Sequence, residues 1–113
     1  MGNSATATLF YGVTFPDDID IEVDVFDRAD DAASEDDCPC VFAFHCHYDD
    51  PIYYVAIKDA RFEADWGDEV AIDIRQLQVT VTAAWNLAIT KFCQEAGLPK
   101  SNNYGWYLVA SYG

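Results

Sequence analysis

The chain has 113 residues, of which 51 % are apolar, so it fits a single domain over residues 1–113 with ample material for a packed core. Its 20 acidic residues against 6 basic ones give a formal net charge of −14, and such a surface repels nucleic acid and anionic membranes. No apolar run approaches the about 20 residues that cross a bilayer, and the N-terminal MGNSATATLF lacks the basic residue that opens a signal peptide. We therefore expect a cytoplasmic protein that contacts no membrane and no nucleic acid directly.

Two strands are expected in the first quarter of the chain. Residues 5–15 are rich in β-branched and aromatic side chains, with Gly12 as a candidate bulge. After a turn signal at 16–18, residues 18–26 alternate strictly between apolar and acidic side chains. A period of two predicts a half-buried strand that carries its carboxylates on the outer face.

The rest of the chain predicts further strands and one helix. Residues 27–39 are typical of a charged loop, with a short helical turn within it as an alternative. A helix is predicted over 82–96, where apolar residues recur every three or four positions and Gly97 and Pro99 follow. Strands are predicted over 40–48, 52–58, 69–74 and 105–112, and over 77–81 as a strand leading into the helix. The predicted fold class is α+β, with an antiparallel sheet of about five or six strands and one main helix packed on it.

The acidic residues are concentrated in one segment. Residues 17–37 hold 11 of the 20, with Arg28 as the only base, whereas the chain beyond residue 50 is almost balanced in charge. An Asp-rich surface arises either from adaptation to high salt or from selection for a cationic partner, and the clustering favours a dedicated acidic face. The candidate partner-binding residues are Asp18, Asp20, Glu22, Asp24, Asp27, Asp30, Asp31, Glu35, Asp36 and Asp37.

The strand predicted over 18–26 indicates how this face would bind. Same-face residues of a strand lie about 6.7 Å apart, which is similar to the distance between successive phosphates of a nucleic-acid strand. Its four outward carboxylates would offer a row of negative charges to a phosphate-binding groove. The alternative is a solvated polar face, because acids on an outer strand also discourage edge-to-edge pairing.

Metal binding has two candidate patterns. Asp20, Glu22 and Asp24 resemble the start of a calcium loop, but Val25 stands where that loop requires glycine. On a strand over 40–48, the cysteines of the Cys/His cluster would face one side and its histidines the other, which disfavours a shared ion. Packed thiols are favoured over a metal site or a disulfide, and we expect no metal ligands and no cofactor. The cluster consists of Cys38, Cys40, His45, Cys46 and His47.

No catalytic constellation stands out. The two histidines pair with no particular nucleophile, no Gly-rich phosphate loop is present, and carboxylate pairs lack specificity in so acidic a chain. We therefore predict that the protein is not an enzyme. The aromatic residues make up 15 % of the chain, and packing between helix and sheet is favoured for them. The alternative is that some of them form the seam of a homodimer or a contact with a partner.

Three segments of the second half carry a resemblance, namely HCHYDDPIYYVAI, AAWNLAITKFCQEAGL and the ending GWYLVASYG. Over residues 40–113 the chain resembles a group of small phage-encoded proteins of unassigned function. The resemblance implies a shared fold and a viral origin, and it brings no catalytic residues. It also implies a context, because small acidic viral proteins often block host nucleic-acid-directed machinery by occupying DNA-binding grooves. The acidic segment 17–37 lies outside the resemblance.

The expected function is that of a non-enzymatic acidic phage protein in the host cytoplasm. It would bind a basic surface of a host protein that normally binds nucleic acid, as a nucleic-acid mimic that inhibits a defence nuclease such as a CRISPR effector. The alternative is a structural or accessory phage protein with a solvated acidic face and no basic partner.

Overall fold

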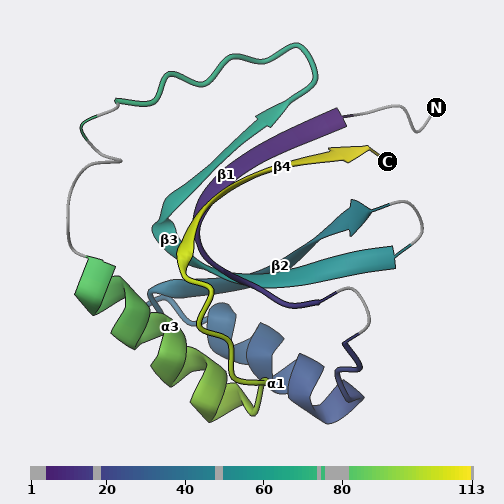
Figure 1. Ribbon diagram of the computed structural model, residues 1–113, viewed down its shortest axis with the longest axis vertical. Coiled ribbons are helices and arrows are strands. Elements are labelled where there is room, and N and C mark those ends of the chain that lie inside the picture. Colours follow the sequence, from purple (N-terminus) through teal and green to yellow (C-terminus); the bar gives the residue numbers. More distant parts are fainter. Residues whose placement is uncertain (1–4, 17–18, 48–49, 74, 76–81, 113) are drawn as a thin grey trace.

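An antiparallel sheet with two helices on one side makes up the described part of the molecule (Figure 1). The computed structural model describes residues 5–16, 19–47, 50–73, 75 and 82–112. The sheet has the order β2-β3-β1-β4, and these residues form four strands, fewer than predicted. The α+β class and the antiparallel pairing are confirmed. The elements are β1 (Ala5–Thr14), α1 (Val23–Ala33), β2 (Cys40–His47), β3 (Asp50–Asp65), α3 (Thr82–Ala96) and β4 (Gly105–Tyr112).

Most predicted elements occur close to their expected bounds. β1, α3 and β4 lie where the sequence placed them, and β2 and β3 form the predicted hairpin. β3 continues to Asp65 because its second half pairs with the first half of β1. The strand predicted over 69–74 is wrong for residues 69–73, which form no strand. Residue 74 and the strand predicted at 77–81 lie outside the described residues.

The largest error concerns residues 18–26, where the predicted strand is wrong. Irregular backbone at 19–22 is followed by α1, which also replaces most of the predicted charged loop. The alternation holds only at Ile19 and Ile21, which pack against the core, whereas Val23 is 73 % exposed. From there the inward residues follow the spacing of a helix. They are Val25, Phe26, Ala29, Ala32 and Ala33.

β1 and β3 bend at the point where the register of their pairing shifts. Phe10 pairs with Arg61 and Gly12 pairs with Ala56, so Tyr11 alone stands opposite four residues of β3. The register shift lies beside Gly12, where a bulge was expected, but the additional residues belong to β3. Such irregularities bend strands. The bend gives the sheet the strong curvature seen in Figure 1.

The curved sheet has a core on each face. The main core lies under the helices and includes Tyr11, Val13, Phe15, Phe42, Val55, Ile57, Ile89, Phe92 and Cys93. On the other face Phe10, Tyr54 and Ala56 are buried as a smaller cluster. The rings of Phe10 and Tyr54 stack there with their centroids 4.0 Å apart. Curvature thus buries residues on the face that the helices do not cover.

α3 ends at the glycine signal found in the sequence. Gly97 has a φ of 80°, and the N–H of Leu98 donates to the carbonyl of Cys93 at 2.9 Å. This closes the last turn and buries Leu98 against the core. In the described residues, neither helix has the length and apolar composition needed to cross a membrane.

Candidate acidic binding surface

α1 and its flanking residues carry the acidic segment. Asp18 lies outside the described residues, and each of the other nine predicted partner-binding acids is exposed. We call these nine residues the acidic surface. Its members are Asp20 and Glu22 before α1, Asp24, Asp27, Asp30 and Asp31 on α1, and Glu35, Asp36 and Asp37 after it.

The predicted row of carboxylates along a strand is wrong. Asp20 and Glu22 lie in irregular backbone and Asp24 lies on the helix, so the spacing of a strand does not apply. On α1, Asp24, Asp27 and Asp31 follow one another at intervals of three and four residues. Such residues are neighbours on a helix, with their Cβ atoms about 5–6 Å apart. The structure therefore brings these three acids together in one stripe along α1.

The acidic surface keeps its charge unpaired. Among the described residues, the ion pairs join Arg61 to Glu63 and Arg75 to Asp73, and none includes an acid of this surface. Arg28 is the one base within the segment, and its Nη1 lies 3.4 Å from the position of a Cβ placed on Gly97. Its guanidinium therefore extends towards the end of α3. The Nζ of Lys58 also lies at this surface and donates to the backbone carbonyl of Glu35 at 3.1 Å. Nine carboxylates against these two cations leave this side of the molecule negative.

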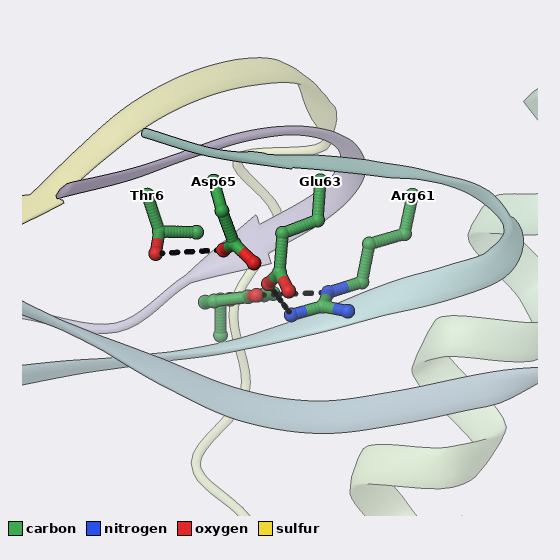
Figure 2. Close-up of polar contacts among 5 residues, drawn as sticks. Thr6, Arg61, Glu63 and Asp65 are labelled. Atoms are coloured by element: carbon green, nitrogen blue, oxygen red, sulfur yellow. Dashed lines mark hydrogen bonds and ion pairs between the residues drawn. The ribbon is translucent and has the colours of Figure 1, made fainter. Parts of the chain in front are cut away.

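Figure 2 shows where one of the other bases is held. Arg61 donates from Nη2 to Oε2 of Glu63 at 3.0 Å and from Nε to the hydroxyl of Tyr54 at 3.0 Å. Beside this group the hydroxyl of Thr6 donates to Oδ1 of Asp65 at 3.3 Å. The hydrogen bond between Thr6 and Asp65 supports the pairing of β1 with the second half of β3, whereas the contacts of Arg61 lie within β3. Because Glu63 and Tyr54 hold the guanidinium of Arg61, this cation does not offset the acids of α1.

The charges on α1 oppose helix stability at its C-terminal end. Carbonyl groups at a helix C-terminus favour cations, yet the last turn contains Asp31 and no base, and Glu35 follows closely. The hydroxyl of Ser34 donates to the carbonyl of Asp31 at 2.7 Å and satisfies one of these groups. Acids at this position cost folding free energy, so the stability of the fold does not explain why they are there.

Asp30 borders a small aromatic hollow beside the acidic stripe. The hollow has a volume of about 250 Å³. Its other lining residues come from α1, β2 and β3, and they are Phe26, Phe42, Ala43, Phe44 and Tyr53. Asp30 is therefore the acid of α1 that adjoins apolar surface.

The described thiols of the core are buried and protonated. Cys40 on β2 and Cys93 on α3 belong to the main core. Burial, together with the neighbouring thiols of Cys38 and Cys93, raises the pKa of Cys40 to about 12. Burial also raises the pKa of Cys93 to about 11. Protonated thiols are poor nucleophiles and poor metal ligands, which supports the prediction of packed thiols.

The histidine side of the Cys/His cluster is separate. The ring of His45 lies 6.4 Å from that of Tyr54, which belongs to the smaller cluster on the face opposite Cys40. The side chains of Cys46 and His47 lie outside the described residues. Within the described ranges, no group of three His, Cys, Asp or Glu side chains comes together to hold a metal ion.

A groove between the end of α1 and the outer face of α3 was missed by the sequence analysis. Its volume is about 610 Å³. Its apolar walls are formed by Ala32, Cys38, Pro39, Ala84, Leu87, Ala88 and Phe92, and its charged residues are Glu35, Asp37, Lys91 and Glu95. Leu87 is the residue that could have indicated this groove from the sequence, because it is a leucine outside the inward stripe of the predicted helix. In the structure it is 69 % exposed.

Comparisons of the chain with protein-family models, with curated proteins and with solved structures found no match.

Proposed function

We propose that this chain is a non-enzymatic protein whose acidic surface binds a basic surface of another protein. One observation carries the proposal: nine exposed carboxylates gather on and around α1, and none of them is ion-paired within the described residues. Like charges held this close repel, and a cationic partner relieves that repulsion. The acids at the C-terminal end of α1 add a cost that binding would also offset.

The finer form of the proposal is that the partner normally binds nucleic acid. Asp24, Asp27 and Asp31 form a short line of negative charges on α1, as phosphates do on a nucleic-acid strand. A groove built to bind phosphates would accept such a line. The resemblance to small phage proteins makes a host defence nuclease, such as a CRISPR effector, the first class of partner to test.

The test compares two variants with equal changes in net charge. The first replaces acids of the stripe as Asp24→Asn, Asp27→Asn and Asp31→Asn. The second replaces exposed acids elsewhere as Asp59→Asn, Asp68→Asn and Glu69→Gln. Each protein is immobilised, exposed to bacterial lysate, washed at rising NaCl concentration and challenged with duplex DNA, and retained proteins are identified by mass spectrometry.

We expect the wild type and the second variant to retain the same basic protein, and the first variant to lose it. Salt should release that protein, because steering by exposed charges is screened over about 8 Å at physiological ionic strength. Release by duplex DNA would support nucleic-acid mimicry specifically. Equal retention by both variants, or retention unaffected by salt, would contradict the role of the acidic surface.

A second candidate function is that of an accessory phage protein that associates with itself and keeps a solvated acidic face. Leu108 favours it, because this residue is 76 % exposed on β4, an edge strand of the sheet. Exposed edges and apolar side chains promote pairing between copies. Sedimentation of wild type and Leu108→Ser would show whether dimers form through this edge.

A further inference from the structure

The groove between α1 and α3 combines apolar walls with exposed acids. Along α3, the residues Ala84, Leu87, Lys91 and Glu95 recur at intervals of three and four, so one face of the helix borders the groove. Leu87 is the large apolar side chain of that face, and its 69 % exposure leaves most of it without a packing partner in the described residues. A partner that covered this side chain would bind more tightly, because burying its apolar surface is favourable.

Charge defines which partner the groove suits. Glu35, Asp37 and Glu95 border it and are exposed, and Lys91 is the base among the lining residues. The Nζ of Lys58 lies beside them and donates to the backbone carbonyl of Glu35 at 3.1 Å. None of the three carboxylates forms an ion pair within the described part of the chain. The first two belong to the acidic surface, so the groove continues that surface onto α3. Its occupant must therefore present cations around an apolar centre.

The backbone beside the groove points to recognition by side chains. The N–H of Cys38 donates to the carbonyl of Glu35 at 3.1 Å, and the carbonyl of Pro39 accepts from the N–H of Lys58 at 2.8 Å. Pro39 has no N–H to offer. An added strand would find these groups occupied, whereas an amphipathic helix binds through its side chains alone.

We infer that the groove between α1 and α3 receives the apolar face of a basic amphipathic helix of the partner protein. This inference rests on the proposed function and states where and how the partner docks. A volume of about 610 Å³ suits a few apolar side chains, with the backbone of the bound helix outside. Lysine or arginine side chains flanking them would reach Glu35, Asp37 and Glu95.

Two synthetic peptides of identical composition provide the test. The probe is a peptide of about 18 residues of leucine, lysine and alanine, long enough to form a helix, with its leucines on one face. Its scrambled isomer has the same charge and no apolar face. Binding to the full chain is measured by calorimetry at about 50 mM and about 500 mM NaCl, and the binding site is mapped by amide chemical-shift changes.

The variants separate the groove from the general acidity of the chain. Leu87→Ser removes the exposed leucine of the groove, and Val70→Ser removes an exposed aliphatic side chain of the segment after β3. Glu95→Gln neutralises a groove carboxylate, and Glu69→Gln neutralises an exposed carboxylate of the segment after β3. Each change is at the surface, and far-ultraviolet circular dichroism checks that each variant is folded.

The amphipathic peptide should bind at low salt more tightly than its isomer and shift the amides of residues 84–95 and 35–38. Leu87→Ser should weaken binding of the amphipathic peptide by about tenfold or more, which corresponds to the loss of one buried leucine. Glu95→Gln should weaken this binding less, and Val70→Ser and Glu69→Gln should leave it unchanged.

Equal binding of both peptides, with no effect of Leu87→Ser, would overturn the groove as the docking site and leave the acidic surface as the binding feature. Unchanged affinity for the amphipathic peptide at both salt concentrations would overturn the cationic character of the occupant. Absence of binding by either peptide at low salt would overturn the groove proposal. The lysate experiment with the α1 variants tests the wider function independently, so the two failures are distinguishable.

Discussion

A Cβ atom placed on Gly12 would lie 2.0 Å from the carbonyl oxygen of Val55. Gly12 pairs with Ala56, and the backbone of Val55 and Ala56 lies against it, so any side chain at position 12 must displace backbone. We expect Gly12→Ala to lower the free energy of unfolding by about 3 kcal/mol, the upper part of the range for overpacking. Urea denaturation of purified protein measures the difference.

Gly105 provides the matched control for that substitution. It pairs with Gly12 from β4, yet no atom lies within 4 Å of a Cβ added there. Gly105→Ala should change stability by less than about 0.5 kcal/mol or stabilise the protein slightly. Equal destabilisation by both substitutions would show that the close approach to Val55 is not the cause.

The two ends of α1 should respond oppositely to the loss of an acid. Asp31 lies in the last turn, where a negative charge opposes the helix dipole, and Asp24 lies in the first turn, where a negative charge is favourable. Asp31→Asn should therefore stabilise the protein and Asp24→Asn should destabilise it, each by roughly 0.3–1 kcal/mol at low ionic strength. Thermal denaturation at low and high salt measures both effects. The same sign for both variants would mean that general charge repulsion outweighs the dipole.

A hydrogen bond between β1 and α3 should contribute measurably to stability. The hydroxyl of Tyr11 donates to Oδ1 of Asn86 at 2.8 Å. Tyr11→Phe should cost about 1 kcal/mol of unfolding free energy, and Asn86→Ala should cost less in that background than in the wild type. Tyr53→Phe is the control, because the hydroxyl of Tyr53 forms no hydrogen bond in the described residues. Full additivity of the Tyr11 and Asn86 changes would refute the coupling.

The buried thiols should make the protein less stable in alkali. The pKa of Cys40 is raised to about 12 and that of Cys93 to about 11, from an ordinary value of 9.0. Above pH 9 the unfolded chain releases these protons while the folded chain retains them. The free energy of unfolding should therefore fall as the pH rises from about 9 through about 11 to 12.

Urea denaturation midpoints measured from about pH 9 to about pH 12 show how steeply the free energy of unfolding falls with pH. Cys93→Ala should make this fall shallower. The comparison between variants matters because burial also raises the pKa of Tyr11, which adds to the same trend. Identical slopes for wild type and Cys93→Ala would show that this thiol does not contribute.

Local signals explain which elements were predictable. Gly97 and Pro99 mark the end of α3 in the sequence, and the irregularity beside Gly12 follows from a glycine inside a strand pattern. α1 was not predictable in the same way. The alternation from Ile19 to Val25 imitates a strand, and the helical stripe that follows depends on small alanines that give a weak apolar signal.

The candidate site was predictable only in part. The acids could be located from their positions in the sequence, but their arrangement on a helix instead of a strand could not. The groove required contact between the segment after α1 and the outer face of α3, which lie far apart along the chain. No periodicity within either segment encodes that contact.

The sequence by itself determined the charge of this protein, its concentration in residues 17–37, and the strands and helix whose patterns are local. The tertiary structure decided the backbone that displays the acids and the exposure of Leu87 beside Glu95. The physical reason is that solvation preferences are properties of single residues, whereas packing against distant segments selects among the local conformations that those preferences allow.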